Sequence, residues 1–173
     1  MKIRTPGPGM GRGADNGETG AAEFLRNREN GNIALARKLG RDLAMALLGF
    51  HLPRRPRGLE EGNLQVRLLY SFALIQAVET GSPNSILSHT TIGSFYDCIA
   101  ERDPGTYDFI TDSAIFSLYL LAEEEEEASV AIGRVFARAC GREGDPDFQA
   151  AGMEIYETCR LQTFDLLDRV SYC

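Results

Sequence analysis

The side chain best placed to do chemistry is His89, one of two histidines in the 173-residue chain. Tyr96 follows it by two helical turns and lies on nearly the same face of a predicted helix, and Thr90 is its neighbour. His89, Thr90 and Tyr96 are therefore the predicted lining of a pocket between helices, which would serve as a small-molecule-binding or enzymatic site. A histidine hydrogen-bonded at a helix–helix contact is the simpler alternative. His89 and Cys98 form no local nucleophile–base pair, because nine residues turn a helix by about 900° and place them on opposite sides.

Carboxylates occur in two arrangements, and neither predicts catalysis. Asp97 and Glu101 share a helix face, but they lie beside Arg102 near a predicted helix end, where we expect exposed surface. The five glutamates at 123–127 fan around a helix at about 100° per residue and cannot converge on one ion, so they indicate a solvated acidic face. The sequence thus predicts no catalytic residue, no metal site and no cofactor.

Basic residues are concentrated in the first part of the chain. Arg54, Arg55 and Arg57 stand in a connector with two prolines, where they could bind phosphates of a nucleic acid or an anionic surface. A nucleic-acid-associated regulator that uses this connector and the basic N-terminal arm is therefore one alternative function. Three observations disfavour nucleic-acid binding: the run of arginines is short, no aromatic residues are interleaved with it, and the net charge of the chain is −7. They indicate a solvated connector instead. The glycines near the N-terminus lack the strand and helix that a phosphate-binding loop needs.

The C-terminal residues favour an interaction function. An amphipathic pattern starts at Asp145-Pro146 and continues through Leu166, Leu167 and Val170 to Tyr172, which together are the predicted partner-binding surface. Symmetric dimers are a common way to cover such a face. The leading prediction is a non-enzymatic protein-interaction or regulatory module that self-associates or binds a helical protein.

Composition limits the class of protein. The hydrophobic fraction of 43% and charged fraction of 25% are typical of a globular domain. Four cysteines without a C-x-x-C pair favour a reducing compartment. The apolar runs are too short for a spanning helix, and no signal peptide is recognisable, so we expect a cytoplasmic protein.

The apolar spacing predicts an all-α fold, a single-domain bundle of six to seven helices. Asp103-Pro104-Gly105 is expected to break the chain, and Ser82-Pro83 and Asp145-Pro146 to start helices. The expected helices cover residues 21–30, 33–50, 63–79, 82–101, 111–122, 128–140 and 146–173. The division between the fifth and sixth, near the glutamates, is a preference over one long helix.

Charge changes sign along the chain. Residues 1–70 hold 12 Lys and Arg against 7 Asp and Glu, and residues 71–173 hold 6 against 18. Together with composition, this predicts a flexible Gly/Pro-rich tail at 1–20, a basic helical segment and connector at 21–58, and an acidic helical core domain at 59–173. Whether the basic part docks on the acidic core is left open by the sequence.

Overall fold

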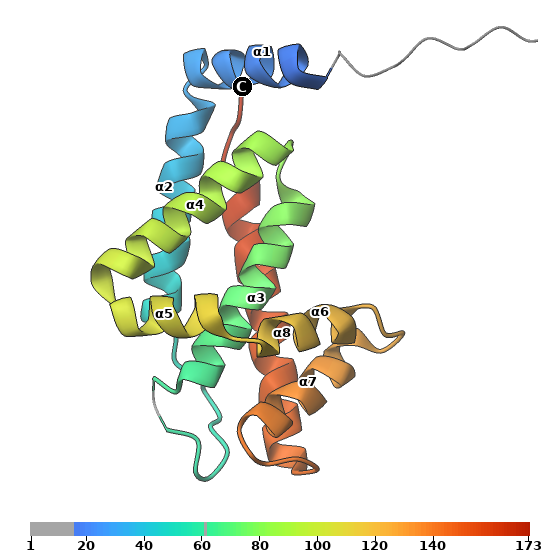
Figure 1. The fold of residues 1–173 in the computed structure, drawn as a ribbon. Coiled ribbons are helices and arrows are strands. Elements are labelled where there is room, and N and C mark those ends of the chain that lie inside the picture. The colour runs from blue at the N-terminus through green and yellow to red at the C-terminus, as the bar shows by residue number, and fades with distance from the viewer. Residues whose placement is uncertain (1–15, 61) are drawn as a thin grey trace, which may run out of the picture.

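Eight α-helices and no strands make up the part of the chain that the computed structural model describes, residues 16–60 and 62–173 (Figure 1). The helices are α1 (Asn16–Glu29), α2 (Asn32–Leu48), α3 (Leu64–Gly81), α4 (Ser85–Arg102), α5 (Pro104–Asp112), α6 (Ile115–Glu123), α7 (Ala128–Ala139) and α8 (Pro146–Asp168). The all-α bundle is confirmed. Residues 1–15 of the predicted tail lie outside the described residues. Helix α1 begins at Asn16, so the last five residues of the predicted tail are helical.

Side-chain caps set where several helices begin. Asn63 accepts a hydrogen bond from the Gln65 amide at 2.8 Å at the start of α3, and Asp145 accepts from the Asp147 amide at 3.0 Å at the start of α8. The helix start predicted at Ser82 is wrong by two residues. Asn84 is the cap of α4, because its side chain accepts from the Leu87 amide at 3.0 Å.

The helix α5 is the element that the sequence prediction missed. Asp103-Pro104-Gly105 was expected to break the chain, but Asp103 caps α5 and Pro104 occupies its first position. This is the same start signal as Asp145-Pro146. Helix α5 brings the number of helices in the described residues to eight, where seven were expected.

Helix α3 lies at the centre of the core, as its all-round apolar character predicts. Residues 68–75 are all buried. The Phe72 ring lies 5.2 Å from Phe116 and 5.3 Å from Tyr119 on α6, and 6.5 Å from Tyr156 on α8, measured between ring centroids. Aromatic contacts from two other helices therefore fix α3 between them.

Glycines allow the closest helix contacts. A Cβ atom at Gly40 of α2 would lie 2.3 Å from the backbone oxygen of Thr91 on α4. Where α7 crosses α8, a Cβ at Gly133 would lie 2.5 Å from the Gln149 oxygen. At each of these two points the helix backbones lie so close together that only glycine, which has no Cβ atom, fits between them.

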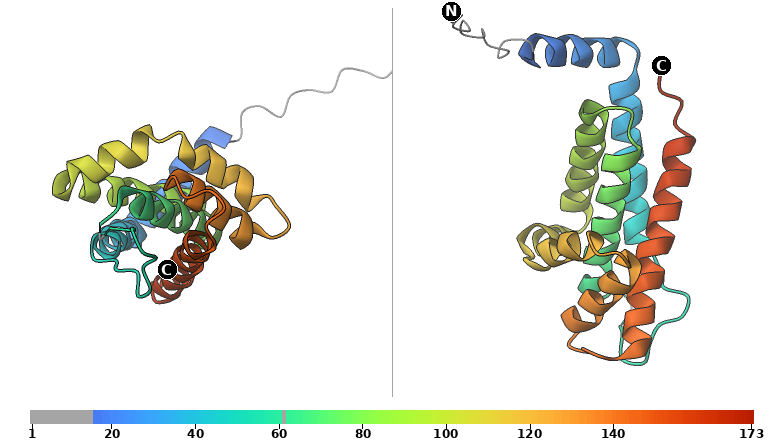
Figure 2. Two further views of the ribbon diagram at one scale, coloured as in Figure 1. Left: turned by 90° about the horizontal axis from the view of Figure 1, so that it is seen from below. Right: turned by 90° about the vertical axis from the view of Figure 1, so that its right-hand side faces the viewer.

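The predicted boundary at 58/59 does not separate two packing units. Helix α2 packs principally on α4, and α3 and α7 pack on α8. Leu39, Leu43 and Leu47 of α2 belong to the same core cluster as Phe72 and Ile155. The basic segment thus supplies one wall of the bundle (Figure 2).

Two further helix ends differ from expectation. The preferred division near the glutamates matches the structure, since α6 ends at Glu123 and α7 begins at Ala128. The final helix was expected to reach the C-terminus, but α8 ends at Asp168. Residues 169–173 leave it and run toward α1, as the right-hand view of Figure 2 shows.

Candidate functional site

The structure places His89 and Thr90 in an open groove of about 410 Å³ between α2 and α4. Arg37 and Arg41, one helical turn apart, line it from α2. The Ser94 hydroxyl donates a hydrogen bond to the Arg37 carbonyl oxygen at 2.9 Å and ties the two helices together at the groove. One side-chain-to-backbone hydrogen bond therefore links the two walls of the groove.

Side chains of both charges line this groove. Asp97 and Glu101 line it from α4, opposite Arg37 and Arg41. Among the described residues, none of these four side chains forms an ion pair within 4.0 Å. The α2 wall of the groove thus carries positive charge and the α4 wall carries negative charge. Cys98 also lines it, but no hydrogen bond in the described structure joins its thiol to His89.

Tyr96 does not join His89 and Thr90. Its ring lies 5.4 Å from Phe95 and 6.2 Å from Tyr107 of α5, between centroids. Burial, and then the nearby Tyr107 and Glu79, raise the pKa of Tyr96 above its usual value. This tyrosine packs between α4 and α5, so only two of the three predicted pocket residues share a groove.

The predicted partner-binding residues at the C-terminus are largely engaged within the chain. Leu167 is only 6% exposed and faces Gly81 of α3, where a Cβ would lie 2.9 Å from its side chain. Val170 packs on the main core. Tyr172 packs on a small cluster formed by α2 and α4. Leu166 is less engaged than the other three. It is half-buried and lines a groove of about 560 Å³ beside the connector.

Buried asparagines hold the last residue in this position. The Asn32 side chain donates to the Cys173 carbonyl oxygen at 2.7 Å and accepts from the Cys173 amide at 2.9 Å. Its amide nitrogen also donates to the Asn27 side-chain oxygen at 3.0 Å. Asn30 adds a longer hydrogen bond to the Cys173 carbonyl, at 3.2 Å. This polar contact fixes the C-terminal segment against the α1–α2 junction.

The connector arginines stay on the surface. Arg54, Arg55 and Arg57 are all exposed, and Arg55 also lines a small groove with Leu59. They lie within a few residues of one another in the loop between α2 and α3. Their use as a phosphate-binding site stays a prediction.

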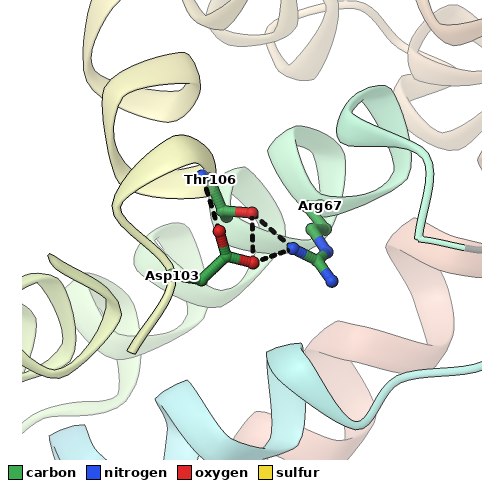
Figure 3. Close-up of polar contacts among 3 residues, drawn as sticks. All are labelled: Arg67, Asp103 and Thr106. Atoms are coloured by element: carbon green, nitrogen blue, oxygen red, sulfur yellow. Dashed lines mark hydrogen bonds and ion pairs between the residues drawn. The ribbon is translucent and has the colours of Figure 1, made fainter. Parts of the chain in front are cut away.

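A polar network that the sequence prediction missed joins α3 to the α4–α5 junction (Figure 3). The Asp103 carboxylate accepts hydrogen bonds from the Thr106 amide at 3.1 Å and from the Thr106 hydroxyl at 3.0 Å. Arg67 of α3 donates to both Asp103 and Thr106. The Thr106 amide is the main cause that lowers the pKa of Asp103, and Arg67 adds to it. The helix-start signal at Asp103-Pro104 could have identified this aspartate.

The outer side of α6 is apolar and uncovered. Leu118 is 43% exposed, Leu120 42% and Leu121 64%. Tyr119 and Ala122 are the buried side chains of this helix. Because apolar residues occupy almost every position from 115 to 122, periodicity alone could not separate the buried side from the exposed one.

Helix α6 is anchored on its inner side, which fixes the direction of the leucines. The Glu123 carboxylate accepts hydrogen bonds from the Tyr156 hydroxyl at 2.7 Å and from Arg160 at 2.8 Å, both on α8. Burial and the neighbouring Glu123 raise the pKa of Tyr156 to about 12. The exposed glutamates at 124–127 follow directly. Helix α6 and the turn that follows it lie at one edge of the molecule (Figure 1).

No three His, Cys, Asp or Glu side chains gather as metal ligands within residues 16–60 and 62–173. Over the same residues, no helix combines the length and the apolar character needed to cross a membrane. Comparison with models of protein families, with curated proteins and with solved structures finds no match for this chain.

Proposed function

We propose that this chain is a helical protein-interaction module that self-associates through α6. The observation that carries the proposal is the exposure of Leu118, Leu120 and Leu121 on a helix whose other side is fixed in the core. Leu118 and Leu121 are neighbours on the helix surface because they are three residues apart. Burying such exposed apolar side chains removes apolar surface from water and so favours association.

The position of this surface differs from the one predicted at the C-terminus. Leu167 and Tyr172 already pack against α3 and against the α2–α4 cluster, so a partner could reach them only after the C-terminal segment moved. Leu118 and Leu121 need no such rearrangement. The interaction hypothesis is therefore kept, and its surface is reassigned to α6.

The test is the mass of the protein in solution, measured by size-exclusion chromatography with light scattering up to about 100 µM. We expect a concentration-dependent dimer, because a short helix face makes a small interface and small interfaces are weak. In L118S/L121S the dimer dissociation constant should rise about tenfold or more.

Leu161 on α8 provides the matched control, since it is 71% exposed and lies on a different helix. L161S removes the same kind of side chain and should leave the dimer unchanged. A protein that stays monomeric over the whole concentration range, or an L161S effect equal to that of L118S/L121S, would contradict the proposal.

A second candidate function is binding of a small dipolar molecule in the α2–α4 groove. It is favoured by the placement of His89 and Thr90 beside unpaired arginines and carboxylates. A panel of amino acids tested by thermal shift examines it. A stabilisation that disappears in R41Q supports this function, and the absence of any shift across the panel rejects it.

A further inference from the structure

We propose that the site in which Tyr172 and Cys173 are held is a peptide-binding site, which residues 169–173 of the chain itself occupy in this structure. The ligand that fits it is an extended peptide that carries a tyrosine, presented by another protein. The site lies where α2 and α4 begin, next to α1, and is separate from α6 (Figure 1). This inference therefore does not depend on the proposed function.

One part of the site recognises the backbone of its occupant. The Asn32 side chain accepts a hydrogen bond from the Cys173 amide at 2.9 Å and donates one to the Cys173 carbonyl oxygen at 2.7 Å. The edge strand of a sheet binds an extended peptide through the same two backbone groups. These bonds involve no side chain of the occupant, so they do not depend on the residue type there, except that proline lacks the amide.

Asn32 is held in this orientation by contacts other than the occupant. It is only 2% exposed, and its amide nitrogen also donates to the Asn27 side-chain oxygen at 3.0 Å. Asn27 in turn donates to the Glu23 carbonyl oxygen of α1 at 2.9 Å. Because these bonds fix the side chain before a peptide arrives, little side-chain entropy is lost on binding.

The second part of the site accepts an aromatic ring. Ile33, Ala36 and Leu87 form a small buried cluster apart from the main core, and Tyr172 packs against it. The fully buried Thr91 has its hydroxyl beside that of Tyr172. The apolar side chains suit the ring, and the buried hydroxyl suits a phenol better than a phenyl group.

The tyrosine of the chain itself leaves this part of the site incompletely used. Among the described residues, the buried oxygens of Thr91 and Tyr172 have no hydrogen-bond partner of ordinary geometry. Burial raises the pKa of Tyr172, and the adjacent Thr91 hydroxyl offsets this only in part. Unpaired buried hydroxyls cost free energy. Only residues 169–171 connect Tyr172 to the end of α8, and a peptide without this connection is free to form the missing bond.

The segment can leave the site without disturbing the main core. The cluster that holds Tyr172 is separate from the core cluster. Residues 169–173 form no helix, and Ser171 and Cys173 are exposed. Segments with so few buried contacts open at a free energy well below that of global unfolding. An added peptide therefore competes with a local opening equilibrium.

Binding of a synthetic peptide tests the site. The probe is a fluorescein-labelled peptide with the sequence of residues 168–173 and the substitution C173S, followed by fluorescence anisotropy with the whole 173-residue chain. We expect it to bind the Y172A protein, whose own segment lacks the ring, with a dissociation constant on the order of 100 µM. Binding to wild type should be about tenfold weaker, because its own segment competes. Tyr172→Ala in the peptide should abolish binding.

A measurement on wild type makes the test independent of how Y172A folds. The unlabelled peptide at about 1 mM should displace residues 169–173 and accelerate amide exchange at Cys173 about tenfold, measured by NMR. The Tyr172→Ala peptide is the matched control and should leave the exchange rate unchanged.

Variants of Thr91 and Asn32 test the two parts of the site. Tyr172→Phe in the peptide should weaken binding to Y172A about fivefold, and this difference should disappear in Y172A/T91V, which lacks the opposing hydroxyl. Y172A/N32A should lose peptide binding. Y172A/N30A is the matched control, because Asn30 supplies only the longer, exposed hydrogen bond at 3.2 Å, and it should retain most of the binding.

Three results would overturn the inference. They are the absence of both peptide binding and accelerated exchange, equal binding of the tyrosine and alanine peptides, and equal losses in Y172A/N32A and Y172A/N30A. A wild-type dimer that Y172A dissociates and L118S/L121S does not would show that residues 169–173 are exchanged between copies, and would overturn another protein as the source of the peptide. Failure of peptide binding leaves the α6 proposal intact, since the mass of L118S/L121S alone decides it.

Discussion

Asp103 connects three helices through a single carboxylate. Its backbone amide closes α4 by donating to the Ile99 oxygen at 2.8 Å, and its side chain caps α5 through Thr106. Arg67 brings the third helix, α3, to the same group. A residue that satisfies helix-end amides and an arginine together has more effect on stability than a surface ion pair would.

Substitution of Asp103 separates its two roles. D103A removes the cap and the partner of Arg67, and we expect a loss of about 1–2 kcal/mol in the free energy of unfolding. D103N keeps a side chain that caps helices equally well, so it should lose only the charge contact with Arg67 and cost less. Urea denaturation measures both. D108N, at an exposed site on α5, should change little.

The same carboxylate makes the stability of the fold depend on pH in a defined direction. The pKa of Asp103 is lowered in the folded chain, so its ionised form stabilises the fold at every pH above the ordinary aspartate pKa of about 4. This contribution is lost as the pH falls through the lowered value. The stability difference between wild type and D103N should therefore be constant near neutrality and shrink below about pH 4. A difference that grows on acidification would contradict the assignment.

Asn32 is the residue that fixes the C-terminal segment. It is buried and makes two hydrogen bonds to the backbone of Cys173. N32A leaves the Cys173 amide without a protein partner and leaves its carbonyl with only the longer hydrogen bond from Asn30, and we expect a loss of about 1–3 kcal/mol in unfolding free energy. Amide exchange at Tyr172 and Cys173 should also accelerate.

Asn30 offers the comparison, because it is exposed and contributes one longer hydrogen bond to the same carbonyl. N30A should therefore cost well under half as much as N32A. Equal losses for the two variants would show that the Cys173 contact does not depend on the buried amide.

At the scale of elements, the contact between α2 and α4 depends on a missing side chain. G40A would place a methyl group 2.3 Å from the Thr91 oxygen, so the two helices would have to move apart. We expect a loss of about 1–3 kcal/mol, typical of overpacking. Thermal unfolding followed by circular dichroism measures it.

Gly93 on α4 provides the control for Gly40. A Cβ there meets no atom within 4 Å, and alanine is favoured over glycine inside a helix by about 1 kcal/mol. G93A should therefore stabilise the protein while G40A destabilises it. The same sign for both variants would contradict a close contact at Gly40.

The type of most elements could be predicted from the spacing of apolar residues, but their details could not. The stretch at residues 64–81 is apolar on all sides, which indicates central burial without naming its neighbours. The error at Asp103 arose because Asp-Pro-Gly suits both a turn and a helix start, and only the hydrogen bond to Thr106 distinguishes them. The exposed side of α6 was missed because too many of its positions are apolar.

The candidate site was less predictable than the fold. His89 and Thr90 share a groove because they are neighbours on α4, but the arginines opposite come from α2, fifty residues earlier in the chain. Tyr96 turned toward α5, a helix that was not predicted. Which side chains meet across two helices depends on the angle at which the helices pack, and the spacing of apolar residues does not specify that angle.

For the whole molecule, the change of charge along the sequence does not coincide with a structural division. Leu39, Leu43 and Leu47 of the basic segment are buried in the common core. Burial of a leucine stabilises a protein by about 2 kcal/mol, so removing these three side chains costs as much as the total stability of many domains.

A fragment comprising residues 59–173 should therefore fail to unfold cooperatively, with weak helical circular dichroism and no sharp thermal transition. The comparison is a chain that starts at residue 16 and retains α2. It should melt close to the full-length protein. A cooperative transition in the shorter fragment would show that the core is complete without α2.

The burial of Cys159 has a consequence for the motions of the bundle. Its thiol lies between α8 and α3, donates to the Tyr70 oxygen at 3.2 Å, and has a pKa raised to about 12 by burial. Alkylation at this position requires the two helices to separate, whereas the exposed Cys173 reacts at once. Under mild conditions, the slow reaction of one sulfur thus reports how often the centre of the protein opens to water, without any label added to the chain.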